Sequence, residues 1–314
     1  MATGGPKNPK GDLPFEPEEP GEDQPPEGSG RVPGYAHDLS LSPCSVSPIP
    51  PSSRSTLQFR ANQEMEWARG HRQEVFDAYA KLKESRDGKI INGDLFMTLL
   101  PSVNSNPELV HTLDLRDMNY LVSDLYEATV AHNSSTGANT VVIMIGVAGI
   151  GKSTRAKHLV DKNPDAVHTI LDFNGADWSA LTEVINVAIR KDRSVDILYV
   201  GGDVAGAVSR TVSRFKRDSR IVPMETQVFL HRAAPINFIK AVNEFRLQGV
   251  QYLAYDTKTK GYFDEPEDVI ALANSDLADP NNNPAGIASL LEESFRAQQL
   301  QPDAQRAFLS AKEE

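Results

Sequence analysis

The stretch 141–160, VVIMIGVAGIGKSTRAKHLV, constrains the fold of this chain more than any other. Its apolar, β-branched start predicts a buried strand, glycines end that strand, and the residues from Lys152 onward are typical of a helix. The intervening loop fits the pattern G-x-x-x-x-G-K-[ST], through Gly146, Val147, Ala148, Gly149, Ile150, Gly151, Lys152 and Ser153. Such a loop between a strand and a helix predicts a nucleotide triphosphate site.

The residue types in this loop suit a phosphate ligand. Glycines let the backbone N–H groups wrap around a β-phosphate, and the following helix points its positive end at the same anion. We expect Lys152 to reach the β- and γ-phosphates and the Ser153 hydroxyl to hold Mg²⁺, with Thr154 completing the nucleotide site. The expected ligands are ATP or GTP together with Mg²⁺.

From residue 139 onward, short apolar strands alternate with amphipathic helices. The expected strands are 140–145, 167–173, 195–200 and 250–256, and the expected helices are 152–162, 178–191, 203–217 and 224–248. Strands that are apolar on both faces and separated by helices predict a parallel sheet covered by helices on both sides. The expected fold class is therefore α/β, a P-loop NTPase with its sheet sandwiched by helices.

The chain divides into four expected segments. They are a disordered Pro-rich arm at 1–56, a helical extension at 57–138, a P-loop kinase core at 139–279 and a helical tail at 280–314. The arm contains 12 of the 21 prolines and few large apolar residues, so it buries too little surface to fold. A flexible tether and a partner-docking arm both remain open for it. In the extension, Asn92–Gly93 marks a turn before a short helix at 94–100.

Composition excludes several classes of protein. A net charge of −11 argues against general nucleic-acid binding, which needs a positive surface. The single cysteine, Cys44, has no intramolecular disulfide partner, so we expect a reducing compartment. No apolar run is long enough to span a membrane, and the N-terminus lacks the apolar region of a signal peptide.

Acidic side chains at strand ends are the candidates for positioning water, metal or an acceptor hydroxyl. Asp172 closes the strand TILD; a general base that takes a hydroxyl proton and a helix N-cap are both open interpretations. Asp203 follows ILYVGG and has the same two interpretations. His231 could face the site, or it could be a surface or core histidine.

A run of arginines follows the third core strand, in 209-SRTVSRFKRDSRIVP-223. Arg210, Arg214 and Arg217 are spaced at i, i+4 and i+7 and share one helical face. Arginines that close over a triphosphate neutralise the charge of the reacting phosphoryl group. A solvated basic face is the alternative interpretation.

These motifs together resemble the zeta toxin family of P-loop phosphotransferases over residues 72–257. The resemblance is carried by the helical segment before the loop, by GVAGIGKST, by the strand that ends in Asp172, and by DILYV with its Arg-rich helix. Its most specific mark is Arg220-Ile-Val-Pro223, followed by the helix that bears His231. Two departures stand out: Gly201–Val204 where relatives often have Arg-Asp-Pro, and Ser219 where glycine is common.

The resemblance implies a kinase that transfers a phosphoryl group from ATP or GTP to a small-molecule hydroxyl, with nucleotide sugars such as UDP-N-acetylglucosamine as the acceptor class. It implies that Lys152 and Ser153 bind phosphate and Mg²⁺, that Asp172 is the base, and that Arg214 and Arg220 are lid arginines. An antitoxin-like or other protein partner and a cytoplasmic location, in a bacterial or phage-infected cell, are further expectations. A motor of the helicase or packaging type and a catalytically silent nucleotide-binding module are the alternatives.

Overall fold

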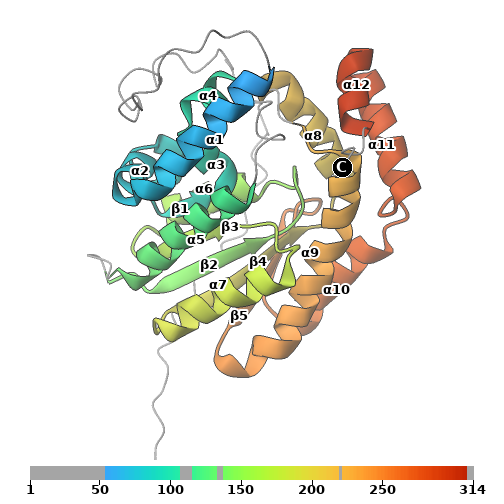
Figure 1. The fold of residues 1–314 in the computed structure, drawn as a ribbon. Coiled ribbons are helices and arrows are strands. Elements are labelled where there is room, and N and C mark those ends of the chain that lie inside the picture. Colours follow the sequence, from blue (N-terminus) through green and yellow to red (C-terminus); the bar gives the residue numbers. More distant parts are fainter. Residues whose placement is uncertain (1–53, 107–114, 133–136, 219–220, 310–314) are drawn as a thin grey trace, which may run out of the picture.

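The computed structural model describes residues 54–106, 115–132, 137–218 and 221–309 (Figure 1). Residues 1–53 of the expected arm lie outside that part of the chain. The described residues form a mixed α/β structure around one sheet of six strands. The strands are β1 (Ile90–Asn92), β2 (Thr140–Ile145), β3 (Val167–Asp172), β4 (Ser194–Gly201), β5 (Gln251–Asp256) and β6 (Gly261–Phe263).

The sheet has the order β1-β3-β2-β4-β5-β6. Strands β1 to β5 run parallel, and β6 pairs antiparallel with β5. The four strands expected from the sequence agree with the structure to within one residue at each end. Their β-branched, apolar residues are buried on both faces, as the predicted parallel sheet requires.

Helices cover both faces of the sheet. Helix α1 (Arg54–Gly70) begins three residues earlier than the expected extension, within the expected arm. The extension continues with α2 (Arg72–Ala80), the 3₁₀ helix η1 (Lys83–Ser85), α3 (Gly93–Met97), α4 (Pro101–Ser105) and α5 (Leu115–Ala131). The remaining helices are α6 (Lys152–Lys162), α7 (Trp178–Arg190), α8 (Val204–Asp218), α9 (Met224–Phe245), the 3₁₀ helix η3 (Arg246–Gln248), α10 (Pro266–Ala278), α11 (Pro284–Ala297) and α12 (Pro302–Leu309).

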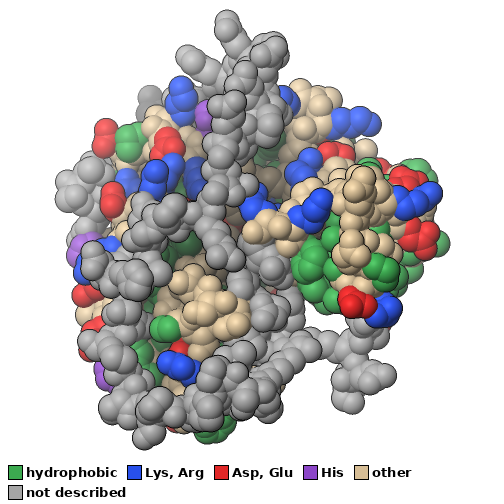
Figure 2. Space-filling model, turned by 90° about the horizontal axis from the view of Figure 1, so that it is seen from above, with side chains coloured by type: hydrophobic (Ala, Val, Ile, Leu, Met, Phe, Trp, Pro, Cys, Tyr) green, Lys and Arg blue, Asp and Glu red, His purple; other side chains and the backbone are tan. Residues whose placement is uncertain are grey.

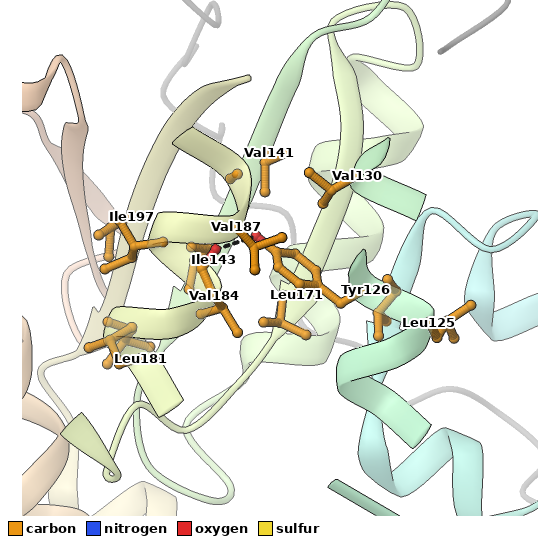
Figure 3. Close-up of a cluster of buried hydrophobic side chains, with 14 of the residues drawn as sticks. Leu125, Tyr126, Val130, Val141, Ile143, Leu171, Leu181, Val184, Val187 and Ile197 are labelled. Atoms are coloured by element: carbon orange, nitrogen blue, oxygen red, sulfur yellow. Dashed lines mark hydrogen bonds between the residues drawn. The ribbon is translucent and has the colours of Figure 1, made fainter. Parts of the chain in front are cut away.

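The larger hydrophobic core lies on the sheet face that α5, α7, α9 and α10 cover. Alternate residues of β2 and β4 point into it, among them Ile143 and Ile197, and Tyr126 of α5 reaches across to α7 (Figure 3). The Tyr126 hydroxyl donates a hydrogen bond of 2.9 Å to the carbonyl of Val184. A second core, built on the other residues of the same strands, packs against α6 on the opposite face.

The segment 57–138 differs from its prediction because it is not entirely helical. Ile90–Asn92 forms strand β1, which pairs in parallel with β3 and places Asn92 opposite Asp172. The expected turn at Asn92–Gly93 is therefore a strand end that leads directly into α3. Buried Tyr79 holds this strand, because its hydroxyl donates to the Ile90 carbonyl and accepts from the Asn92 N–H, each at 2.9 Å.

Other details of the extension also differ from the sequence expectations. The expected helix 94–100 ends at Met97, and Pro101 begins α4, since proline suits the first position of a helix. Phe59 is 54% exposed on α1. Met65 of the same helix and Val75 of α2 are buried.

The tail helices α11 and α12 pack against the rest of the chain. Ile287, Leu291 and Phe308 belong to a third hydrophobic cluster that also includes Val208 and Val212 of α8. Phe308 meets Phe215 of α8 edge to face, with ring centroids 5.7 Å apart. The tail therefore supports α8, the helix that carries the arginine run.

A buried aspartate generates the first testable prediction. Asp196 on β4 is 4% exposed, and burial raises its pKa to about 7. A carboxyl that binds its proton more tightly in the folded state makes the protein less stable as pH rises between its unfolded and folded pKa values. We expect this loss of stability between about pH 4 and pH 7, at up to about 1.4 kcal/mol per pH unit.

Asp196→Asn should remove that contribution and make the protein more stable than the wild type above pH 7. Urea unfolding at several pH values measures the difference between the two proteins. The exposed Asp165→Asn, which also removes one carboxylate, is the matched control for the change in net charge. Parallel profiles for the wild type and Asp196→Asn would contradict this account of the Asp196 carboxyl.

Candidate active site

The candidate site lies at the edge of the sheet where the parallel strands end. β1, β2, β3 and β4 end there at Asn92, Ile145, Asp172 and Gly201. The chain continues from β2 to β3 on one side of β2 and later to β4 on its other side. Ligands in open α/β sheets bind at such a switch point, outside the carboxyl ends of the strands.

The glycine-rich loop 146–151 joins β2 to α6 at this switch point, and Lys152 is the first residue of α6. Val147 and Ile150 anchor the loop, since both side chains are buried in the core beneath it. Thr154 is exposed on the first turn of α6. The loop packs against α8: a Cβ atom on Gly149 would lie 2.3 Å from the carbonyl oxygen of Ala207.

Lys152 folds back over this loop. Its Nζ donates hydrogen bonds to the carbonyl oxygens of Gly146 at 2.8 Å and Val147 at 3.0 Å. Loss of solvent around the ammonium lowers the pKa of Lys152, and the charge of Arg214 lowers it further. The carboxylates of Asp172 and Asp94 act in the opposite direction. Both acidic and basic groups therefore surround this ammonium.

Asp172 links the loop helix to the neighbouring strands. Its Oδ2 accepts a hydrogen bond of 2.6 Å from the Ser153 hydroxyl and one of 2.7 Å from Nδ2 of Asn92. The two expected site residues Ser153 and Asp172 are thus in direct contact. Asp172 does not cap a helix in this arrangement; the N-cap of the following helix, α7, is Asp177.

Asn92 is a site residue that the sequence interpretation missed. Its Oδ1 accepts from the backbone N–H of Leu95 at 3.0 Å and caps α3, while its Nδ2 donates to Asp172. Two β-branched residues precede it in the short segment KIIN, between Gly88 and Gly93. That pattern is the signal that could have identified a strand end instead of a simple turn.

The arginines of α8 have different partners. Arg214 pairs with Asp94 of α3, with 3.3 Å between Nη2 and Oδ2. Arg210 donates from Nε to the Gly149 carbonyl at 2.6 Å and pairs with Asp203. Figure 2 looks onto the end of the molecule where α1, α8 and α12 lie, and it shows Lys and Arg side chains near the centre of that face. Arg220 lies outside the described residues, so its role stays a prediction.

Two other candidates have structural roles. The Asp203 carboxylate accepts a hydrogen bond of 2.8 Å from the Gly206 N–H at the start of α8, which is the geometry of an N-cap. His231 is 4% exposed, and burial lowers its pKa to about 4. It is a buried residue that borders the same small space as Val147 and Ile150 of the loop, which agrees with the core interpretation of this histidine.

A cavity of about 280 Å³ opens beside Ser153 and Asp172, between the extension and the core. It is lined by Glu84, Ile90, Asn92, Asp94, Leu95, Met97, Thr98, Val103, Asn104, Ser153, Lys157, Asp172 and Arg214. Hydroxyl, carboxylate and cationic groups thus meet at one end of a partly apolar space. Proton transfer and charge neutralisation are the chemistry that such a set of groups can supply.

The oxygen pair of Ser153 and Asp172 suits a hard cation such as Mg²⁺, which takes oxygen ligands and commonly needs only one or two carboxylates beside a substrate phosphate. Within the described ranges, no group of three or more His, Cys, Asp or Glu side chains could hold a metal by itself. In the same part of the chain, no helix is both long and apolar enough to cross a membrane. No protein-family model matches the chain, and no curated protein matches it either.

The packing of the glycine-rich loop gives a second prediction, which compares two of its glycines. Both have a positive φ. Gly149→Ala adds a Cβ that would clash with the Ala207 carbonyl, whereas nothing lies within 4 Å of the Cβ in Gly151→Ala. Gly151→Ala should therefore cost only the backbone strain, about 1–2 kcal/mol. Gly149→Ala should cost about 1–3 kcal/mol more from overpacking. Urea unfolding of both variants measures this difference, and equal costs would contradict the contact between the loop and α8.

Proposed function

We propose that this protein is an ATP- or GTP-dependent kinase that transfers the γ-phosphoryl group to a hydroxyl of a small molecule. The observation that carries this proposal is the 2.6 Å hydrogen bond between Ser153 and Asp172. It joins the end of the glycine-rich loop to the carboxylate that lines the neighbouring cavity. The proposed nucleotide site at the loop and the proposed acceptor site in the cavity therefore meet at this pair of residues.

The nucleotide half consists of the loop 146–151, Lys152 and the start of α6. The first N–H groups of a helix have no partner within the helix, and together with the helix dipole they attract an anion. Lys152 adds a positive charge at the same place, and its Nζ already contacts two loop carbonyls. This combination supports the interpretation of the motif as a P-loop.

The acceptor half is the cavity beside Asp172. The acceptor hydroxyl oxygen attacks the γ-phosphorus, a new O–P bond forms, and the bond between the γ-phosphorus and the bridging oxygen breaks to release ADP or GDP. Asp172 accepts the hydroxyl proton, with its Oδ2 held by Ser153 and Asn92. Lys152 and Arg214 neutralise charge on the transferred group.

Ser153 and Asp172 are the residues that would hold Mg²⁺. Bound there, the ion would neutralise phosphate charge between the donor and the acceptor. The placement of Asp172 next to Ser153 means that one carboxylate serves both the metal side and the acceptor side of the site. The lid role of Arg220, an antitoxin-like partner and a cytoplasmic location stay predictions alongside this proposal.

Lys152→Ala tests the nucleotide half. Loss of a charge-assisted contact to phosphate should weaken ATP and GTP binding by about tenfold to a hundredfold. Isothermal titration with each nucleotide in the presence of Mg²⁺ measures the change. Lys162→Ala, at the exposed far end of the same helix, is the matched control and should bind as the wild type does. Unchanged binding by Lys152→Ala would refute the phosphate site.

Asp172→Asn tests the base. The amide cannot accept the hydroxyl proton, so transfer should slow by about 10²- to 10⁴-fold. Nucleotide affinity measured without Mg²⁺ should stay close to the wild-type value, since Asp172 also belongs to the pair that would hold the ion. The rate is followed as ADP release, and the product as an added phosphoryl mass, with a panel of hydroxyl compounds. A fully active Asp172→Asn protein would exclude Asp172 as the base and leave the nucleotide site standing.

A further inference from the structure

The cavity beside Asp172 belongs mostly to the extension. Nine of its 13 lining residues precede residue 105, and only Ser153, Lys157, Asp172 and Arg214 come from the core. The reacting groups are thus provided by the core, and the rest of the cavity wall mainly by η1, β1, α3, α4 and the residues next to them. The chemistry of that wall indicates which acceptor fits, if the proposed function holds.

Part of the wall is apolar. Ile90, Met97 and Val103 are buried side chains that also border the cavity, at 3%, 1% and 4% exposure, and Leu95 joins them there. These residues come from β1, α3 and α4. Leu95 is only partly buried, so water can reach it, and an apolar ligand surface displaces such water favourably. An acceptor with one apolar face therefore gains more binding free energy in this cavity than a uniformly charged acceptor does.

The charged groups of the wall are predominantly acidic. Three carboxylates, Glu84, Asp94 and Asp172, face two cations, Lys157 and Arg214. One of the cations is already paired, because Arg214 lies 3.3 Å from Asp94. The Asp172 carboxylate, at the reacting end of the cavity, accepts hydrogen bonds from two neutral groups, the Asn92 amide and the Ser153 hydroxyl. The residues that line the cavity thus carry one more carboxylate than cations.

We infer that the acceptor is a phosphate-free hydroxyl compound of about the size of a sugar or nucleoside, with an apolar face that packs on Leu95. A phosphate group brings about −1.5 to −2 charges at neutral pH, and like charges brought together in a partly buried site are repelled. The volume of about 280 Å³ lies just below the usual range of about 300–1,000 Å³ for ligand pockets. A nucleotide sugar, the acceptor class that the resemblance implies, is disfavoured on both counts.

The test compares acceptors that lack phosphate groups with one that carries a diphosphate. N-Acetylglucosamine and uridine are the phosphate-free members, and UDP-N-acetylglucosamine combines both units with a diphosphate. With ATP and Mg²⁺, we expect phosphoryl transfer to at least one phosphate-free compound, with kcat/KM at least about tenfold above that for UDP-N-acetylglucosamine. ADP release gives the rates, and mass spectrometry identifies the phosphorylated product.

A comparison of variants tests the reason for the preference. Asp94→Asn removes one carboxylate from the wall and leaves Arg214 without that ionic partner, so the preference for phosphate-free acceptors should fall by about tenfold. Glu74→Gln removes an exposed carboxylate outside the cavity and should leave the preference unchanged. An unchanged preference in Asp94→Asn would refute the charge argument.

The outcomes separate this inference from the proposed function. Preferred phosphorylation of UDP-N-acetylglucosamine would overturn the inference and support the kinase. ATP binding without product from any of the phosphate-free compounds would also overturn it, with nucleotide binding left intact. Failure to bind ATP or GTP, measured by isothermal titration, would overturn the proposed function itself and this inference with it.

Discussion

The described part of the candidate site depends on one carboxylate oxygen, Oδ2 of Asp172. It accepts hydrogen bonds from Ser153 and from Asn92, which are 19 and 80 residues away along the chain. The strand pairing makes this possible, because β1 and β3 run parallel and place Asn92 directly opposite Asp172. Hydrogen bonds to an ionised carboxylate are stronger than neutral ones. The glycine-rich loop, the sheet and the extension are therefore joined at the point where we propose that the proton is transferred.

This arrangement makes the extension part of the site. The position of Asn92 depends on Tyr79, whose buried hydroxyl fixes both Ile90 and Asn92 of β1. Asn92 in turn caps α3, and α3 places the Asp94 carboxylate beside the guanidinium of Arg214. A single chain of hydrogen bonds thus runs from the core of the extension to the cavity wall. A change at Tyr79 would reach Asp172 through two contacts, without touching the loop that we propose binds the nucleotide.

The sequence predicted those parts of the site that depend on local pattern. Strand β2, the loop 146–151 and helix α6 were predicted because an apolar run, glycines and amphipathic spacing follow one another within twenty residues. Strand β1 was missed because three residues give too short a pattern, and its stability comes from pairing with β3. The arginines were located, but the pairing of Arg214 with Asp94 spans 120 residues and is set only by the fold. His231 was ambiguous because burial, which decides its role, is a tertiary property.

The packing of α8 limits how its arginines can act. Its Ala207 touches the glycine-rich loop, and on another side the tail helices hold it through Phe308 and through Gln298, which bonds to both Ser209 and Lys216. Movement of the whole helix would break apolar contacts in a packed cluster, which is costly. Reorientation of an arginine side chain is far cheaper, since rotamer changes of partly exposed residues occur within nanoseconds. We therefore expect α8 to be a fixed support from which Arg214 exchanges Asp94 for phosphate, so that most of the charge is in place before the reaction begins.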